Sequence, residues 1–302
     1  GVLDVGSNTV HLLIVDAHPG SPPIPQQSFK SELRLTRYLD EKGAISQTGL
    51  EKLLAAIKAH FKEAESLKPD EILAFATSAI RDSINSEKIL SAIQDEIGIG
   101  IEVLSGEDEA RLTFLAARRW FGWSSGRLIV IDIGGGSLEI ASGVDEAPEA
   151  ATSLPLGAAR LTKQFLNGDP FTEKSILKLR EYIESQLESV LQAKAHHETR
   201  DRAIATSKTL RTLARLCGDW FEGDGRIIKV DALRKISTKL SEMNLEQRSK
   251  LPGVSGNRAR QIVAGAFVAE SVMRNLDINQ LEICPWALRE GVILRFLDWH
   301  AR

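Results

Sequence analysis

The chain has 302 residues, of which 43% are hydrophobic, 6% aromatic and 26% charged. This balance is typical of a globular protein, and the length predicts two domains. The 38 basic and 41 acidic residues give a net charge of -3, so no basic excess points to nucleic acid or a membrane surface as a partner. Two cysteines exclude a disulfide framework. The sequence lacks a long apolar run and a signal-peptide pattern, so we expect a cytoplasmic protein.

The first part of the chain predicts the element order βββαβαβα from its apolar periodicities. The expected strands lie at residues 2–6, 11–17, 29–35, 72–77 and 101–104, with a loop at 19–25. The expected helices lie at residues 50–61 and 89–97. Ser105 followed by Asp108 has the spacing of a helix capping box, which predicts a third helix from here towards Trp120.

The second part begins in the same way and continues with more helices. The expected strands lie at residues 128–133, 138–142, 151–154, 203–205 and 281–284. The expected helices lie at residues 161–165, 175–191, 210–216, 232–243 and 258–276, and from 286 onwards. Because strands alternate with helices, we expect mostly parallel pairing in an α/β layer architecture.

One short motif occurs twice in the chain. The segments DVGSNT at residues 4–9 and DIGGGS at 132–137 share the pattern Asp-x-Gly-x-x-Ser/Thr, and each lies between two expected strands. The two parts of the chain therefore look like copies of one supersecondary unit. We expect domains at residues 1–120 and 121–302. Two such half-domains facing each other would place both turns in one cleft.

The repeated turns are suited to bind phosphate and a metal ion. Glycines leave backbone amides open to phosphate oxygens, and hydroxyl and amide side chains add donors. The expected phosphate ligands are Ser7, Asn8, Thr9, Gly134, Gly135, Gly136 and Ser137. Asp4 and Asp132 are hard oxygen ligands of the kind that Mg²⁺ takes beside a phosphate. Alternatively, the glycines only form tight hairpins and the aspartates cap them.

Other common motifs of catalysis are missing from the sequence. It contains no P-loop, no dinucleotide-binding glycine motif, no zinc-ligand spacing and no serine hydrolase motif. Phosphoryl chemistry with magnesium remains as the interpretation of the two turns.

Six segments together resemble one known enzyme family. They are DVGSNT at residues 4–9, ATSAIRDS at 76–83, LSGEDEAR at 104–111, IDIGGGSLE at 131–139, LGAARL at 156–161 and ALREG at 287–291. Through them the chain resembles the exopolyphosphatase and guanosine pentaphosphate phosphohydrolase family. The resemblance implies two ribonuclease H-like half-domains of the actin, sugar kinase and acetate kinase fold, with the active site in the cleft between them.

The resemblance also implies roles in catalysis. Glu109 corresponds to the catalytic glutamate that activates water, and Arg81 corresponds to a ligand of the terminal phosphate. A general base and a guanidinium suit these tasks chemically. From the residues alone, Glu109 is also explained as an acidic residue favoured at a helix N-terminus, and Arg81 as a surface partner of Asp82.

Further residues of the site follow from the resemblance in the same way. Residues 134–137 correspond to the phosphate loop, and Asp132 and Glu139 correspond to the carboxylates near the metal. Lys208 and Arg289 are candidates for binding the next phosphates of a chain. Lys208 belongs to a run at residues 205–209 that stands where many relatives have a more glycine-rich turn, and a lysine there suits a phosphate chain better than a purine.

The implied activity is that of an exopolyphosphatase, which releases orthophosphate from the end of inorganic polyphosphate and also converts guanosine pentaphosphate to tetraphosphate. Three alternatives stay open: a phosphohydrolase specific for guanosine pentaphosphate, a nucleotide-sensing binding protein with little polyphosphate activity, and a kinase of the same fold. The sequence ends soon after ALREG without a His-Asp metal-phosphohydrolase signature, as expected of the short, two-domain type. The resemblance leaves a homodimer open as the assembly.

Overall fold

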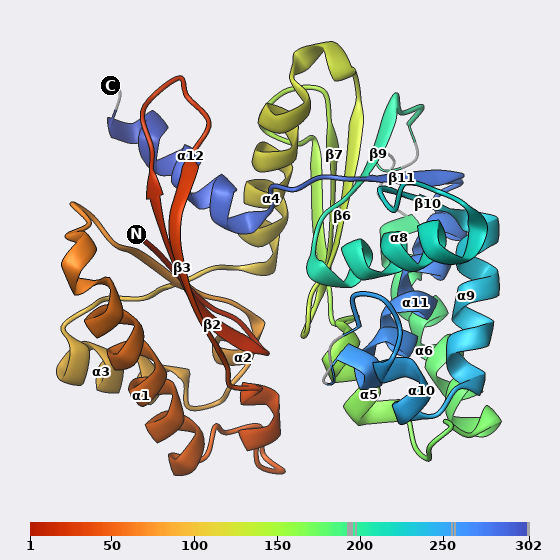
Figure 1. Ribbon diagram of the computed structural model, residues 1–302, viewed down its shortest axis with the longest axis horizontal. Helices are drawn as coiled ribbons and strands as arrows, with labels where there is room; N and C mark the ends of the chain where they lie inside the picture. The colour runs from red at the N-terminus through yellow and green to blue at the C-terminus, as the bar shows by residue number, and fades with distance from the viewer. Residues whose placement is uncertain (192–195, 197, 255, 257, 301–302) are drawn as a thin grey trace. The chain divides into compact units, whose positions relative to one another are not determined.

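The computed structural model describes residues 1–191, 196, 198–254, 256 and 258–300 (Figure 1). By their contacts the residues group into two compact units, Gly1–Leu112 with Leu288–Arg302, and Thr113–Ala287. The contact-based units therefore assign the end of the chain to the first unit. The two actin-like ATPase-type domains expected from the sequence, at 1–120 and 121–302, stay a prediction.

The first unit contains a five-stranded sheet in the order β3-β2-β1-β4-β5. An antiparallel meander makes up one side of it, and parallel strands make up the other. The meander consists of β1 (Val2–Val5), β2 (Thr9–Asp16) and β3 (Ile24–Glu32), and the parallel part adds β4 (Leu73–Ala76) and β5 (Glu102–Val103). Helical crossovers precede β4 and β5, as parallel pairing requires.

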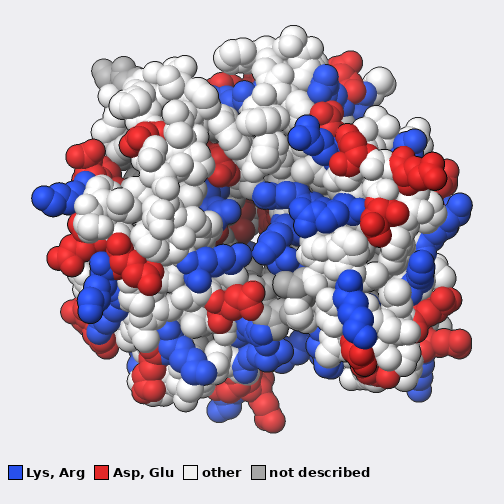
Figure 2. All heavy atoms as spheres, in the orientation of Figure 1, with Lys and Arg blue, Asp and Glu red and all other residues white. Residues whose placement is uncertain are grey.

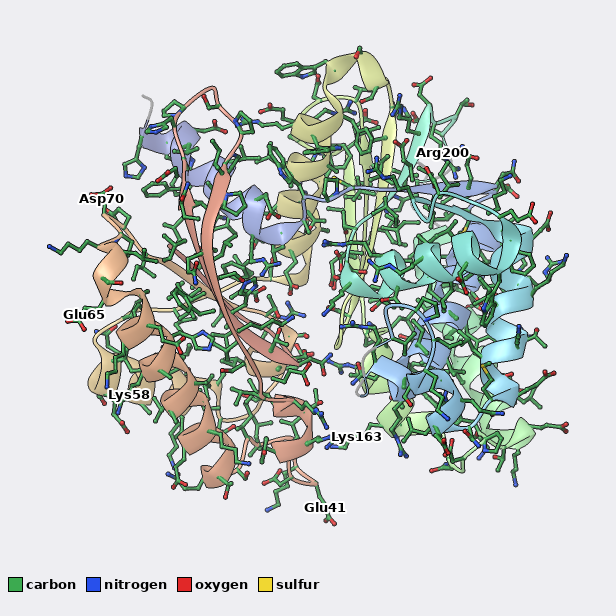
Figure 3. All side chains as sticks on the ribbon, in the orientation of Figure 1. Glu41, Lys58, Glu65, Asp70, Lys163 and Arg200 are labelled. Atoms are coloured by element: carbon green, nitrogen blue, oxygen red, sulfur yellow. The ribbon has the colours of Figure 1, made fainter. Side chains whose placement is uncertain are left out.

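One face of this sheet is covered by α1 (Gln47–Ala64) and α3 (Ser86–Ile97). Apolar residues at helical spacing on both helices pack against Leu3 and its neighbours on the sheet. On the outer side, Lys58 Nζ of α1 lies 2.6 Å from Glu96 Oε2 of α3 (Figure 3). The two helices therefore form one layer with an apolar inner side and a charged outer side.

The other face of the sheet packs against α12 (Leu288–His300) and the beginning of α4 (Gly106–Phe121). Val2 points to this face because side chains alternate along a strand. Gly291 allows α12 to approach α4 closely, since a Cβ at this position would lie 2.0 Å from the carbonyl oxygen of Leu112. The glycine of the ALREG segment thus has a packing role.

The second unit repeats this plan in a six-stranded sheet, ordered β10-β11-β9-β6-β7-β8. Its antiparallel meander consists of β6 (Leu128–Ile133), β7 (Leu138–Gly143) and β8 (Ala150–Leu154). Its parallel part adds β9 (Arg202–Ala205) and β11 (Gln280–Ile283), and β10 (Ile227–Lys229) forms an antiparallel edge. Without β10, the order β8-β7-β6-β9-β11 and its strand directions match β3-β2-β1-β4-β5 of the first unit, which confirms the repeat.

The helices of the second unit gather around α11 (Arg258–Asn275), which is buried along most of its length. It contacts α5 (Ala158–Phe165), α6 (Glu173–Leu191), α8 (Lys208–Phe221), α9 (Val230–Glu242) and α10 (Leu245–Ser249). Its stretch at residues 262–273 is apolar apart from Glu270 and Ser271, as expected of a helix that is surrounded in this way. Among the described residues, no helix is both long and apolar enough to cross a membrane.

Two expectations about the sheets are wrong. The pairing is mixed rather than mostly parallel, because short turns join the first three strands of each unit and such turns allow only antiparallel neighbours. The third strand covers only residues 29–32 of the expected range 29–35. Instead β3 begins at Ile24, inside the expected loop at 19–25. Pro25 is tolerated there because β3 is an edge strand and its pairing with β2 is irregular at this point, between Ile14 and Val15.

Candidate active site

The repeated motif forms the same turn in both units. The amide of Gly6 donates to the carbonyl oxygen of Thr9 at 3.0 Å, and the amide of Gly134 donates to that of Ser137 at 2.9 Å. In both cases the turn joins the first two strands of the sheet. The shared sequence pattern therefore has a shared backbone geometry.

The second turn is tied to α5 through its carbonyl groups. The carbonyl oxygens of Gly134 and Gly135 accept hydrogen bonds from the first amides of α5 at 3.0 Å, and that of Gly136 accepts one from Arg160 Nε at 2.7 Å. Within the described part of the chain, the amides of Gly135 and Gly136 have no acceptor. A turn with occupied carbonyls and unoccupied amides presents positive partial charge, which suits an anion.

Gly157 fixes how closely α5 approaches this turn. A Cβ at Gly157 would lie 2.2 Å from the carbonyl carbon of Gly136 and 2.4 Å from the amide nitrogen of Ser137. These distances leave no room for any side chain. The second residue of the LGAARL segment must therefore be glycine for the turn to keep its place.

Asp132 lies just before this turn, at the end of β6. The hydroxyl of Thr206 donates a hydrogen bond to Asp132 Oδ2, and the amide of Ser207 donates to the same carboxylate. Burial raises the pKa of Asp132. These two hydrogen bonds, together with the positive charge of Arg211, offset only part of this effect.

Glu139 lies directly opposite Asp132 on β7, and its side chain is 5% exposed. The hydroxyl of Ser153 donates to Glu139 Oε1 at 2.9 Å. Residues opposite each other on antiparallel strands project from the same face of the sheet. Two carboxylates with remaining oxygen lone pairs fit Mg²⁺, which takes one or two carboxylates and completes its shell with phosphate and water.

Asp4 lies at the equivalent position in the first unit, where its opposite residue is His11. Glu139 of the second unit therefore has no counterpart in the first unit. No cluster of three or more His, Cys, Asp or Glu residues suited to a metal is found over the described ranges. The metal-binding roles of Asp4, Asp132 and Glu139 stay a prediction.

Lys208 is the first residue of α8, and its side chain is exposed. Lys and Arg side chains gather over the start of this helix (Figure 2). Ser207 precedes Lys208 with a φ of 52°, a backbone conformation that favours glycine. The hydroxyl oxygen of Ser207 accepts a hydrogen bond from the amide of Leu210 at 3.3 Å and so caps the helix. The conformation accounts for the glycine-rich turn that the resemblance implies for many relatives at this place.

Glu109 and Arg81 lie together in the first unit. Glu109 is on the first turn of α4 and is 6% exposed, and Arg81 ends the short helix α2 (Ser78–Arg81). Arg81 Nη1 donates to Glu109 Oε1 and, at 3.0 Å, to the carbonyl oxygen of Leu104, while Nε donates to Asp82 Oδ1 at 3.2 Å. Burial alone would lower the pKa of Arg81, but the charges of Glu109 and Asp82 raise it overall.

The other expected residues of the first turn mainly hold its shape. The hydroxyl oxygens of Ser7 and Ser78 are 2.9 Å apart, and both residues are buried. The carbonyl oxygen of Asn8 accepts the amides of residues 33 and 34 at 3.0 Å each. These bonds connect the turn to α2 and to the end of β3. A direct role of Ser7, Asn8 and Thr9 in binding phosphate stays a prediction.

Arg289 is the second residue of α12 and reaches the first sheet. Its Nη1 lies 3.4 Å from Nε2 of His11, which itself is 2.7 Å from the hydroxyl oxygen of Ser28. Within the first unit, Arg289 therefore lies beside β2, the strand that follows the turn at residues 4–9. That both turns share one cleft stays a prediction.

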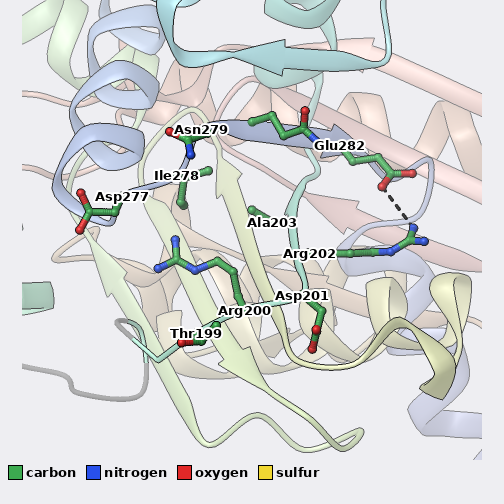
Figure 4. Close-up of a pocket in the computed structure, with 10 residues that line it drawn as sticks. Thr199, Arg200, Asp201, Arg202, Ala203, Asp277, Ile278, Asn279 and Glu282 are labelled. Carbon is green, nitrogen blue, oxygen red and sulfur yellow. Dashed lines mark hydrogen bonds and ion pairs between the residues drawn. The ribbon is translucent and has the colours of Figure 1, made fainter.

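A cavity of about 440 Å³ opens where β9 and β11 begin, at the opposite ends of these strands from Thr206 (Figure 4). Its lining includes Arg200, Asp277 and the ion pair between Arg202 Nη1 and Glu282 Oε2, which are 3.2 Å apart. Arg202 begins β9, whereas Thr206 follows the end of that strand. None of the expected site residues lines this cavity, so it is separate from the candidate site.

Sequence reasoning missed two residues that shape the site, Thr206 and Gly157. Thr206 follows β9, and β9 pairs in parallel with β6, so their ends meet at one edge of the sheet. The available signal for Thr206 in the sequence was its place among polar residues directly after a short apolar strand. Gly157 stood inside a motif without an assigned role, and only the distance to the turn reveals its function.

Known proteins are similar to this chain in sequence and in fold. The sequence profile of the Ppx/GppA phosphatase family matches residues 13–300. Exopolyphosphatase 1 of Mycobacterium tuberculosis is 51% identical over 305 residues, covering 100% of this chain and 89% of that protein. Among solved structures, an exopolyphosphatase from Cytophaga hutchinsonii has a TM-score of 0.88 at 25% identity, covering 99% of this chain and 97% of that one.

A Ppx/GppA family member from Aquifex aeolicus has a TM-score of 0.82 at 27% identity, covering 100% of this chain and 98% of that one. The similarity in sequence and fold therefore defines a phosphatase, a hydrolase with the actin-like ATPase-type architecture that the six motifs implied. The chain belongs to the Ppx/GppA phosphatase family.

Proposed function

We propose that this protein is an exopolyphosphatase that removes the terminal phosphate of inorganic polyphosphate and also hydrolyses guanosine pentaphosphate. The observation that carries the proposal is the turn at residues 134–137, whose carbonyl groups are bonded to α5 and Arg160 while two of its glycine amides have no acceptor in the described part of the chain. Such a turn binds phosphate oxygens without reading a base. The names of the similar proteins support the same substrate class.

In the proposed reaction, a water molecule attacks the terminal phosphorus. The bond between that phosphorus and the bridging oxygen breaks, and the products are orthophosphate and a chain shorter by one phosphate. Glu109 accepts the proton of the attacking water as a general base. Its burial on the first turn of α4 suits a carboxylate that must be held in one orientation.

Arg81 binds the terminal phosphate in this proposal, and Lys208 and Arg289 bind phosphates further along the chain. A phosphoanhydride is already a good leaving group, so positioning and charge neutralisation account for most of the catalysis. Asp132 and Glu139, with Asp4, are the residues proposed to hold Mg²⁺. When bound, the metal would neutralise charge on the phosphate oxygens.

The test is phosphate release from a panel of substrates in the presence of Mg²⁺. Polyphosphate, guanosine pentaphosphate and ATP are compared at matched concentrations, without any acceptor. We expect orthophosphate from polyphosphate and from guanosine pentaphosphate. A kinase would release none without an acceptor, and a nucleotide sensor would bind guanosine pentaphosphate without turnover. Either of these results would overturn the proposal.

A further inference from the structure

The guanidinium of Arg81 lies between two carboxylates and uses its nitrogens unequally. Nε donates to Asp82 Oδ1 at 3.2 Å. Nη1 donates both to Glu109 Oε1 and to the carbonyl oxygen of Leu104, the latter at 3.0 Å. For Nη2 the described part of the chain provides no acceptor. The side chain of Arg81 is 23% exposed, so Nη2 is within reach of a ligand.

Arginine holds a phosphate best through two parallel N–H groups. Nε is bonded to Asp82, so the pair available to a phosphate consists of Nη2 and Nη1. Using this pair requires Nη1 to leave Glu109. The same step frees Glu109 from its ion pair, which a general base needs before it accepts a proton.

Within the described part of the chain, the bond to Asp82 is the one hydrogen bond of the guanidinium that does not use Nη1, and so it need not change during this exchange. The bond to Leu104 shares Nη1 with Glu109 and changes when Nη1 turns to the phosphate. Asp82 directly follows Arg81 in the chain, so its position is set by the same short segment. It therefore remains beside Nε whichever partner Nη1 has.

From this geometry we infer that Asp82 is a positioning residue, which anchors Arg81 through Nε while Arg81 exchanges Glu109 for the terminal phosphate of the substrate. The inference rests on the proposed function, because it takes the ligand of Arg81 to be a phosphate. Asp82 does not contact the reacting atoms and acts through Arg81.

A double-mutant cycle tests this role. The affinity for tripolyphosphate is measured by calorimetric titration of Glu109→Gln protein, in which the expected loss of turnover keeps the ligand intact. Asp82→Ala and Asp82→Asn are each made in two backgrounds, one that keeps Arg81 and one that carries Arg81→Ala. We expect Asp82→Ala to weaken binding about three- to tenfold, since a hydrogen bond between charged groups is lost at a partly exposed site.

With Arg81→Ala, the same Asp82→Ala change is expected to alter the affinity less than about twofold, because the residue through which Asp82 acts is absent. Asp82→Asn keeps an oxygen acceptor for Nε and is expected to bind within about twofold of the parent. Asp95→Asn, a change of an exposed aspartate on α3, serves as the matched control.

An equal loss with and without Arg81, or an equal loss in the Asn and Ala variants, would overturn the inference. Thermal unfolding of each variant identifies any that misfold. If the wild-type protein releases no phosphate from polyphosphate, the proposed function fails separately from this cycle, which measures binding alone.

Discussion

Gly157 and Gly136 are in backbone contact, so that a Cβ on Gly157 would lie 2.2 Å from the carbonyl carbon of Gly136. Gly157 immediately precedes α5, and the first amides of α5 hold the carbonyl groups of the turn. The glycine and the helix therefore determine the position of the candidate phosphate loop together.

Gly157→Ala should displace the turn and impair both stability and activity. We expect a loss of about 1 to 3 kcal/mol in the free energy of unfolding, as for other overpacked sites. Phosphate release should fall more than about tenfold, because the turn amides lose their alignment. Thermal unfolding and phosphate assays check this. Gly100→Ala is the control, since its Cβ would meet its nearest atom at 3.6 Å, an ordinary contact.

Glu109→Gln should lose most turnover without weakening substrate binding, because the amide preserves the shape of the side chain but cannot accept a proton. We expect kcat to fall by about 10²- to 10⁴-fold, the usual contribution of a general base. The control is Glu107→Gln on the same helix turn, where the glutamate is exposed and pairs with Arg111. A Glu109→Gln variant within about threefold of wild type would exclude the role.

Lys208→Ala should raise KM for polyphosphate more than KM for a nucleoside triphosphate. The lysine is exposed at the start of α8 and is proposed to bind a phosphate that does not react. The difference should shrink as salt increases, because exposed charges are screened over about 10 Å at 0.1 M. Steady-state kinetics at two salt concentrations measure this. If only guanosine pentaphosphate were bound more weakly, the lysine would be reading a nucleotide.

The stability of the metal-free protein should depend on pH through Asp132. Burial raises the pKa of Asp132 in the folded state, so the folded state favours the protonated form. This contribution is complete below the pKa of an unfolded aspartate, about 3.9, and is lost as pH rises through the raised value. With a chelator present, Asp132→Asn should therefore have a higher Tm than wild type at about pH 8. The two should converge at about pH 4, and parallel curves would contradict the prediction.

The two cysteines should resist thiol reagents in the folded protein. Cys217 and Cys284 are both buried, and burial raises the pKa of the Cys217 thiol to about 11. Since the thiolate is the reactive form, little of it exists at neutral pH. We expect slow labelling of the native protein by a disulfide reagent and rapid labelling of two thiols after denaturation. Rapid reaction of one thiol in the native protein would argue against this environment.

Strands with a clear apolar pattern could be predicted from the sequence, and the polar edge strand could not. β6 occupies residues 128–133 as expected, because a run rich in β-branched residues lies between Arg127 and the glycines at 134–136. β3 was misplaced because most of its residues are exposed, so it shows no alternation of apolar and polar residues. Similarly, α2 and α10 are too short for a helical period to be visible.

Motifs in the sequence named some residues of the candidate site, and reasoning from the sequence missed those that only the strand order brings there. Glu109 and Arg81 were named from their motifs, and the structure places them in direct contact. Thr206 reaches Asp132 only because β9 lies next to β6, and no local pattern in the sequence specifies that neighbour. The pairing of Asp82 with Arg81 was considered only as a surface contact.

The first unit consists of two separate stretches of chain, and this affects the order in which the protein can fold during synthesis. Val292 and Leu297 of α12 complete an apolar cluster with Val2 and Phe75 of the first sheet. A ribosome reaches α12 only after it has made the whole second unit. Until then, one face of the first sheet is without its last helix, although Arg81 and Glu109 have long been made. A messenger interrupted before the codon for Leu288 would yield a chain with these two residues and an uncovered apolar face, a substrate for chaperones and proteases.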